Sequence, residues 1–405
     1  MKFNQVLVIN LIILISTVYI SAQTPGNIPI TVQRLSNRVL ILSETLMGNN
    51  ITAISSEKGI IIVDVSGLPS TAAKMRTLIE KEFGRADFAY VINTHSHWDH
   101  TFGNQIFPEA LIIGHDHVVE GIERNRDILP RFLESLAERK QTEIRRLEEV
   151  ETESEEEGNI KQFIHTIDRQ MHDFRETLVL TSPHITFNDR MTLDLGDLTI
   201  ELDYFGRAHS TGDIFIRIPE EGIVLTGDLF LDQRWVPLFA GQPVLDIDRW
   251  LEVLGRTLDG PNAVKTVIPG HMDLWEAEKL DLWRDYIADL WENLKVAKEE
   301  GLTLEEVKVK YPLPERCWYL RERGHTDERI QRFHAENIEA FWNQLFVSAA
   351  QEMEEVLRDS GWEGVLAAEK LFDTIKHKPD IYRISEAEFN SLGYRLMAQG
   401  NIWGA

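Results

Sequence analysis

Three histidines and an aspartate lie within six consecutive positions of this chain, directly after an apolar run. The cluster His95-x-His97-x-Asp99-His100 follows residues 88–92, which have the composition of a strand. His95 and His97 project to the same side of an extended backbone because they are two residues apart. The other two donors lie one turn further along, within reach of a second ion. Imidazole and carboxylate are ligands that suit zinc and its neighbours, so the cluster predicts a metal site.

Three later donors stand at the ends of further aliphatic runs. These runs span residues 198–205, 222–227 and 264–270, and they lead into His209, Asp228 and His271. The alternation of apolar and polar residues, together with glycines at the turns, is typical of strands that end in loops. Binding sites are often built from loops at one end of a rigid sheet. We therefore expect the four strand ends to contribute to one site.

In this order the donors resemble those of the metallo-β-lactamase-fold hydrolase superfamily, with a ligand set like that of glyoxalase II. Besides the first cluster, three segments match its later motifs: Ala208–Asp213, Leu225–Asp228 and Ile268–His271. The resemblance extends over roughly residues 30–275. It implies an α/β fold, a four-layer αββα sandwich with the metals at one edge.

The resemblance also implies two metal ions. The expected ligands are His95, His97 and His209 for one ion, Asp99, His100 and His271 for the other, and Asp228 as a bridge between them. Asp64, which ends the run 59–63, matches the family's early aspartate that supports the site from below. The alternative interpretation of Asp64 is a simple turn residue at the end of a strand.

The chemistry follows from these donors. Two nearby cations lower the pKa of a shared water until hydroxide is available near neutral pH, and they polarise the attacked bond. We expect two zinc ions, with iron or manganese as alternative metals. Asp99 is the candidate catalytic residue, because it can orient the water and carry its proton. Cys317, the only cysteine, is interpreted as structural, and His115 and His117 as non-ligands because they fall outside the motif positions.

The N-terminal segment predicts export. One positive charge precedes a nearly aliphatic run from Val6 to Ile20, and small residues follow it. A transmembrane helix needs about 20 apolar residues, so this shorter core favours a cleaved signal peptide over residues 1–22, with an uncleaved anchor as the alternative. We expect a periplasmic or secreted protein with no stable membrane anchor after cleavage. A single cysteine allows no disulfide within the chain, so stability must come from the core.

The charge balance restricts the substrate. The net charge is −24, from 42 basic and 66 acidic residues, whereas nucleic-acid binding needs a surplus of lysine and arginine. We therefore expect a small-molecule substrate and no nucleic acid. The loop at residues 229–239, with several aromatics and one arginine, is a candidate wall of the substrate pocket.

Helical regions are expected within and after the catalytic domain, which we place at residues 25–300. An insertion at 115–180 has apolar residues at helical spacing, and its acidic stretch 151–158 is interpreted as the turn of a helical hairpin. The hairpin would form a pocket wall or a subunit contact, with a solvated spacer as the alternative. Residues 301–405 form a predicted helical C-terminal region, and 385–396 weakly resemble the first helix of a tetratricopeptide-like pair. A homo-oligomer through these helices is an expected assembly.

Together these features predict an exported dinuclear zinc hydrolase acting on a small ester, lactone, thioester or amide. A β-lactamase is one alternative, although Asp228 stands where several lactamases lack an aspartate. A mononuclear iron sulfur dioxygenase, using a subset of the ligands, is the second. A helical interaction protein with a vestigial metal site is the third, and retention of all seven ligand residues counts against it.

Overall fold

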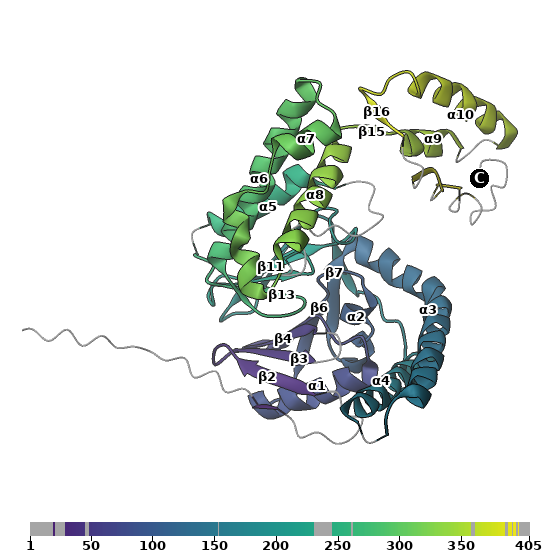
Figure 1. The fold of residues 1–405 in the computed structure, drawn as a ribbon. Helices are drawn as coiled ribbons and strands as arrows, with labels where there is room; N and C mark the ends of the chain where they lie inside the picture. Colours follow the sequence, from purple (N-terminus) through teal and green to yellow (C-terminus); the bar gives the residue numbers. More distant parts are fainter. Residues whose placement is uncertain are drawn as a thin grey trace, which may run out of the picture. The chain divides into compact units, whose positions relative to one another are not determined.

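The computed structural model describes residues 19–20, 29–44, 48–152, 154–230, 245–260, 262–357, 361–384, 388–390, 392–393 and 396. The chain divides into two compact units, and Figure 1 labels many of their helices and strands. The first unit comprises residues 1–92, 98–112 and 124–181, and the second comprises 93–97, 113–123 and 182–405. The predicted signal peptide lies outside the described residues apart from Tyr19 and Ile20, and most of the loop at 229–239 also lies outside them.

The first unit is built on a sheet whose strands follow one another along the chain. Its strands are β1 (Tyr19–Ile20), β2 (Ile30–Arg34), β3 (Val39–Glu44), β4 (Asn50–Ser56), β5 (Gly59–Val63) and β6 (Phe88–Ile92). Successive strands from β1 to β5 pair antiparallel, and β6 joins β5 in parallel. The strands expected at 59–63 and 88–92 are therefore confirmed. Every residue of β5 is buried, as its unbroken aliphatic sequence requires for a strand covered on both faces.

Helix α1 (Pro69–Phe83) covers one face of this sheet. Met75 and Ile79 point into a core with Leu40, Leu42 and other strand residues. A proline at the start and the left-handed Gly84 at the C-cap define the ends of the helix. The short helices α2 (Trp98–Thr101) and η1 (Asn104–Ile106) follow β6, and α2 carries Asp99 and His100 of the histidine cluster.

The insertion is a helical hairpin, as the sequence predicts. It consists of α3 (Asp116–Glu149), α4 (Glu155–His172) and the short π-helix η2 (Asp173–Thr177). The predicted turn at 151–158 is too long, because Ser154 caps α4 by accepting a hydrogen bond from the Glu157 amide. The acidic residues after Ser154 form the first helical turn, where the helix dipole favours negative charge.

The hairpin packs against Trp98 at the start of α2. Trp98, between His97 and Asp99, lies 5.2 Å from Phe132 of α3 and 5.6 Å from Phe174 of η2, between ring centroids. These side chains belong to one apolar cluster, made of Leu68, Trp98, Phe102, Leu129, Phe132, Leu133, Leu136, Phe163, Ile167, Met171, Phe174, Leu178 and Leu180. The interpretation as a solvated spacer is therefore wrong.

The second unit contains a six-stranded sheet in the order β14-β13-β12-β11-β10-β9. Its strands are β9 (Arg190–Asp194), β10 (Thr199–Tyr204), β11 (Ile214–Ile218), β12 (Ile223–Gly227), β13 (Thr266–Pro269) and β14 (Trp275–Glu276). The three strands expected from 198 onwards are β10, β12 and β13. In addition, β8 (Ile185–Phe187) pairs in parallel with the last three residues of β7 (Leu111–His115).

Helices pack against the second sheet around a large aromatic core. They are α5 (Ile247–Leu258), α6 (Ala277–Glu299), α7 (Leu304–Lys310), η3 (Glu315–Arg323) and α8 (Asp327–Gln344). Trp250, Trp283 and Phe341 from three of these helices are almost fully buried in this core. Cys317 is buried in the same cluster, which agrees with its interpretation as a structural thiol.

The C-terminal helices have a small core of their own. The elements are β15 (Val347–Ser348), α9 (Ala349–Leu357), α10 (Gly361–Ile375) and β16 (Tyr382–Arg383). Phe389, Leu392 and Leu396, in the segment that resembles a tetratricopeptide helix, pack with Ala350 and Leu357. That segment therefore buries its apolar face on α9 and α10. Within the described residues, no helix combines the length and apolar character needed to cross a bilayer.

A buried histidine, His334, lies in the core of the second unit. His334 donates from Nε2 to the Tyr311 carbonyl (3.0 Å), so its Nδ1 accepts from the Tyr286 hydroxyl (2.8 Å). Burial lowers the pKa of His334 below its usual 6.5. The unfolded chain thus binds a proton more readily than the folded one, and the stability that the neutral ring contributes is present above pH 6.5 and lost as the pH falls.

We expect a His334→Gln variant to show a shallower loss of stability between pH 7 and pH 5 than the wild type. The glutamine keeps a donor and an acceptor but has no charge to gain. The difference in slope should be at most about 1.4 kcal/mol per pH unit. Urea unfolding at several pH values measures it, and identical slopes would show that His334 contributes nothing to the pH dependence.

Candidate metal centre

The second sheet brings three predicted ligands to one edge. Strand β12 runs parallel to β13, so Asp228 and His271, which follow them, leave the sheet at the same edge. Strand β11 is antiparallel to both β10 and β12, so the β10–β11 connection that carries His209 lies at this edge too. The Thr94 carbonyl accepts a hydrogen bond from the Ile214 amide at the start of β11 (3.0 Å), which places His95 beside them.

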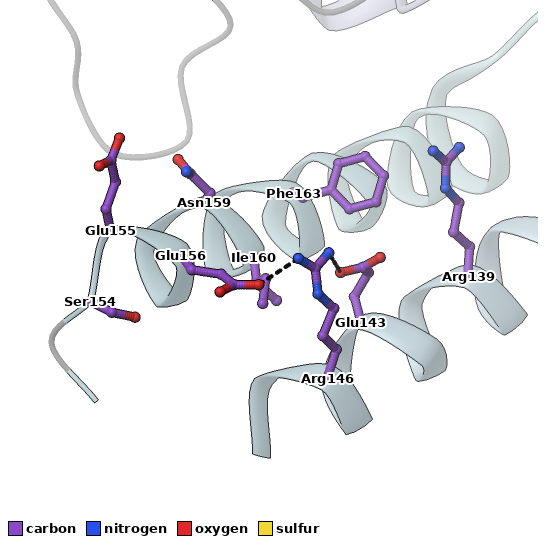
Figure 2. A pocket seen from close by; sticks show the side chains of 9 residues that line it. All are labelled: Arg139, Glu143, Arg146, Ser154, Glu155, Glu156, Asn159, Ile160 and Phe163. Atoms are coloured by element: carbon purple, nitrogen blue, oxygen red, sulfur yellow. Dashed lines mark hydrogen bonds and ion pairs between the residues drawn. The ribbon is translucent and has the colours of Figure 1, made fainter. Parts of the chain in front are cut away.

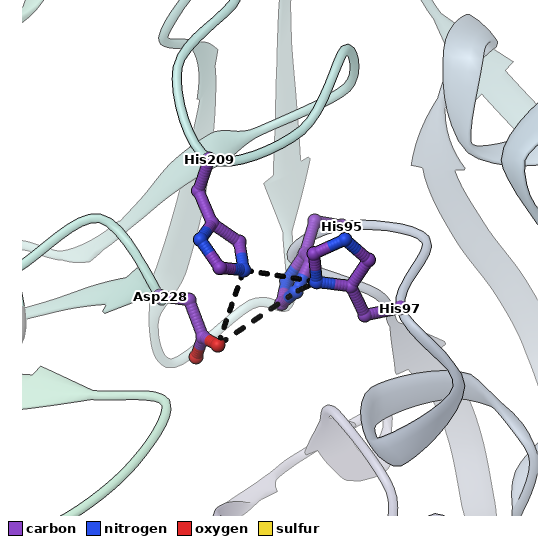
Figure 3. A group of neighbouring side chains, drawn as sticks. All are labelled: His95, His97, His209 and Asp228. Carbon is purple, nitrogen blue, oxygen red and sulfur yellow. Dashed lines mark hydrogen bonds and ion pairs between the residues drawn. The ribbon is translucent and has the colours of Figure 1, made fainter. Parts of the chain in front are cut away.

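Three imidazoles meet at this edge, as Figure 3 shows. The Nδ1 atom of His97 lies 3.0 Å from Nε2 of His95 and 2.9 Å from Nε2 of His209. Zinc–nitrogen bonds of about 2.0–2.1 Å would put tetrahedral ligand atoms about 3.4 Å apart, close to these separations. Together with Asp228, the three histidines offer four ligand atoms that all lie within 4.8 Å of one another. The donor set therefore fits a transition metal.

Asp228 lies between two sets of histidines. Its Oδ2 atom is 3.3 Å from Nε2 of His209 and also 3.3 Å from Nε2 of His271, and it is 4.0 Å from Nε2 of His95. One carboxylate oxygen thus faces both the three-histidine group and His271. This is the arrangement expected of a bridging ligand.

Residues behind the ligands fix their orientation. The Thr94 hydroxyl lies 3.0 Å from Nδ1 of His95, which leaves Nε2 of that ring directed at the metal group. Asp213 accepts hydrogen bonds from the backbone amide and the hydroxyl of Ser210, the residue after His209. Burial raises the pKa of Asp213 to about 7, against the opposing effect of these hydrogen bonds. The turn that carries His209 is thereby closed by side-chain contacts.

The first unit holds Asp64, Asp99 and His100 in contact. Nδ1 of His100 lies 2.9 Å from Oδ2 of Asp64, and Nε2 of His100 lies 3.6 Å from Oδ2 of Asp99. The side-chain amide of Asn49 donates to the Asp99 carboxylate at 3.3 Å. A carboxylate on one ring nitrogen fixes the tautomer of a metal-binding histidine and raises its basicity. Asp64 is therefore more than a turn residue.

The backbone at Asp64 is also unusual. Asp64 and Met272, which follows His271, are the non-glycine residues with positive φ in the described part of the chain, at 57° and 67°. Such conformations cost energy and are retained mainly where the surrounding structure needs them, often at functional sites. At Asp64 this conformation accompanies hydrogen bonds from its amide to Ile92 and from the next amide to His100.

An Asp64→Asn variant should bind metal about 10–100-fold more weakly than the wild type. Asparagine tolerates the left-handed backbone and preserves the shape of the side chain, so the change removes mainly the negative charge behind His100. Competition with a chromophoric chelator measures the affinity. Unchanged affinity would exclude a role for the Asp64 carboxylate in metal binding.

Two further histidines and a surface pocket lie outside the groups of metal-ligand side chains. Among the described residues, the groups suited to a metal contain neither His115 nor His117, in line with their interpretation as non-ligands. A surface pocket of about 790 Å³ lies between α3 and α4 and contains no predicted ligand (Figure 2). Its lining includes Arg139, Arg146 and Phe163, and Arg146 is neutralised by an ion pair with Glu156.

Comparison with known proteins agrees with the fold and the motifs. The model of the metallo-beta-lactamase superfamily matches residues 45–271, which include Asp64 and the whole expected ligand set from His95 to His271. The chain belongs to the metallo-beta-lactamase superfamily. This confirms the resemblance, and with it the expected α/β fold of the superfamily. Members of the metallo-beta-lactamase superfamily are mostly metal-dependent hydrolases.

Solved structures of the superfamily are similar at low sequence identity. The stereoselective inverting sec-alkylsulfatase Pisa1 from Pseudomonas sp. aligns with a TM-score of 0.54 and 16% identity, over 90% of this chain and 59% of that one. A metallo-beta-lactamase from Pontibacter korlensis aligns with a TM-score of 0.41 and 12% identity, over 67% of this chain and 99% of that one. The alkylsulfatase likeness supports the fold alone. No curated protein matches the sequence significantly.

Proposed function

We propose that this metallo-beta-lactamase-fold protein is an exported, two-ion zinc hydrolase that cleaves a small ester, lactone, thioester or amide. The observation that carries the proposal is Asp228, whose Oδ2 atom lies 3.3 Å from the ligand nitrogens of both His209 and His271. A carboxylate in that position can serve two cations at once. The three-histidine group supports one ion, and the remaining predicted donors, Asp99, His100 and His271, complete the proposed set.

Each side chain has a distinct task in this proposal. Bound divalent cations supply Lewis acidity, which polarises a substrate oxygen and lowers the pKa of nearby water. Asp99 receives the proton of the attacking water and holds that water in line with the substrate. The Asn49 amide, which donates to both the carboxylate (3.3 Å) and the carbonyl (3.1 Å) of Asp99, keeps the accepting oxygen in place. No serine or cysteine nucleophile is required.

The seven donors also bear on the alternatives. An iron dioxygenase would use a subset of these ligands on one ion, whereas Asp228 faces imidazoles on two sides. A vestigial site in an interaction protein would have no need to keep three converging histidine nitrogens backed by Thr94. A β-lactam remains a candidate substrate, since the fold accommodates that chemistry.

A substrate panel tests the proposal. Purified protein loaded with zinc, and separately with iron or manganese, is assayed on chromogenic esters, lactones, thioesters, amides and β-lactams. A secondary alkyl sulfate is included because a similar solved structure belongs to an enzyme of that class. We expect hydrolysis of one neutral class, its loss on chelation, and its loss in His97→Ala. Activity that survives chelation, or oxygen consumption by the iron-loaded protein without hydrolysis, would overturn the proposal.

Export is proposed from the N-terminal apolar run, and a small-molecule substrate from the charge of −24. A reporter enzyme that is active only outside the cytoplasm, fused after residue 30, distinguishes an exported protein from one retained in the cytoplasm. We expect reporter activity with residues 1–22 present and none when they are deleted. Equal activity of both fusions would contradict export by this segment.

A further inference from the structure

The first turns of α3 touch the loop that carries two metal ligands. Gly121 lies in these turns, and a Cβ atom placed on it would lie 2.1 Å from Oγ and 2.3 Å from Cβ of Ser96. Cβ atoms in real proteins essentially never lie within 3.0 Å of a heavy atom from a residue that is not their neighbour in the chain. The helix can therefore reach this loop only because residue 121 has no side chain.

The same face of α3 also touches the loop that carries a third ligand. A Cβ atom on Gly212 would lie 3.2 Å from Cγ2 and from the backbone nitrogen of Val118, and 3.3 Å from Cβ of His117. Gly212 comes three residues after His209. Val118 is fully buried and stands three positions before Gly121, so both contacts lie on one side of the helix. Two ligand loops thus rest on one short stretch of α3, residues 116–123.

The contact with Ser96 bears directly on the metal group. Ser96 stands between His95 and His97, whose ligand nitrogens lie 3.0 Å apart. Its Cβ atom is bonded to the backbone, so rotation about the side-chain bond cannot move it away from an intruding group. A methyl group on residue 121 would have to displace either the backbone of Ser96, with its two flanking histidines, or the stretch of α3 that also contacts the His209 loop.

We propose that residues 116–123 of α3 are a spacer that sets the separation of the His95–His97 loop from the His209 loop, and that Gly121 is a positioning residue of the metal site. The proposal rests on the proposed metal binding. It gives the insertion a function at the site, because the helix that begins the hairpin also supports three histidine ligands. Gly121 itself contacts neither metal nor substrate.

The alternative is that Gly121 is merely a glycine in a helix. In that case alanine would be favoured, because glycine is a poor helix former. Gly158 in α4 offers a matched control, since a Cβ atom there would meet nothing within 4 Å. Both substitutions add the same methyl group to a helix, and they differ in whether Ser96 is in the way.

The experiment compares Gly121→Ala, Gly158→Ala, Ser96→Gly and the double variant Ser96→Gly/Gly121→Ala with the wild type. Zinc affinity is measured by competition with a chelator, and the electronic spectrum of the cobalt(II)-loaded protein reports the geometry of the ligands. We expect Gly121→Ala to bind zinc about 10–100-fold more weakly, with an altered cobalt spectrum. Gly158→Ala should match the wild type in both. The double variant should recover the affinity of Ser96→Gly, because the next nearest atom to the new methyl group is Cα of residue 96 at 3.8 Å.

The outcomes separate the two proposals. A wild type that binds no metal would overturn the proposed function itself. A wild type that binds metal while Gly121→Ala has the same affinity and spectrum would overturn only the spacer, even if the variant melts at a lower temperature. If Gly121→Ala does not fold, the double variant decides: recovery of folding and zinc binding supports the contact with Ser96, and failure to recover overturns it.

Discussion

Replacing Asp228 with asparagine is expected to lower the rate of hydrolysis by about 10³-fold or more. The amide has the shape of the carboxylate but lacks the negative charge that faces His209 and His271, each 3.3 Å from Oδ2. Without that charge, two cations close together would repel each other with little compensation. We therefore expect the variant to lose at least one of the two bound ions, as measured by metal analysis of the dialysed protein.

The matched control is Asp281→Asn, which removes the same charge from an exposed side chain paired with Arg284. Surface ion pairs of this kind contribute little, so its metal content and activity should equal those of the wild type. Full activity and two ions in Asp228→Asn would exclude a bridging role for Asp228.

Replacing Trp250 with alanine should have the largest effect on stability, a loss of about 3–5 kcal/mol in the free energy of unfolding. Trp250 is completely buried, and its ring stacks on Phe205 with centroids 5.8 Å apart. Its indole nitrogen donates to the Arg207 carbonyl (3.1 Å), two residues before His209. The substitution would therefore leave a cavity in the core and remove one of two hydrogen bonds to the Arg207 carbonyl, which keeps the one from the Asp246 amide (3.2 Å).

Trp250→Phe separates these two effects. Phenylalanine keeps much of the ring but cannot donate the hydrogen bond, so we expect a smaller loss of about 1–3 kcal/mol. Chemical unfolding followed by circular dichroism gives both values. An alanine variant as stable as the phenylalanine variant would show that the packing of Trp250 contributes little.

Periodicity made the strands that lead to the candidate metal centre predictable from the sequence. The runs at 59–63 and 88–92 coincide with β5 and β6, because buried aliphatic strands leave an unbroken apolar pattern. The start of α4 was predicted wrongly. A run of glutamates has the composition of a loop, but the Ser154 cap and the helix dipole favour it as a first helical turn.

The supporting residues could not be predicted, because each acts through a contact that the sequence does not encode locally. Asn49 reaches Asp99 from 50 positions away, and the segment before β4 in which it lies carries no motif. The residues around Gly121 in the sequence give no sign of its contact with Ser96, which is seen only once α3 is placed in the structure. Thr94 is adjacent to His95, yet a strand-end threonine is ordinary until the ring nitrogen is seen beside its hydroxyl. Candidate metal ligands can be recognised in a sequence because only a few residue types bind metals, whereas the residues that support them are determined by packing in the folded chain.

Metal stoichiometry is the most direct test of the two-ion site. The wild-type protein is purified, stripped with chelator, reconstituted with excess zinc and dialysed, and its metal content is then measured by mass spectrometry against protein concentration. We expect two zinc ions per chain, and fewer in Asp228→Asn. One ion or none per chain in the reconstituted wild type would contradict the two-ion site on which the proposed function rests.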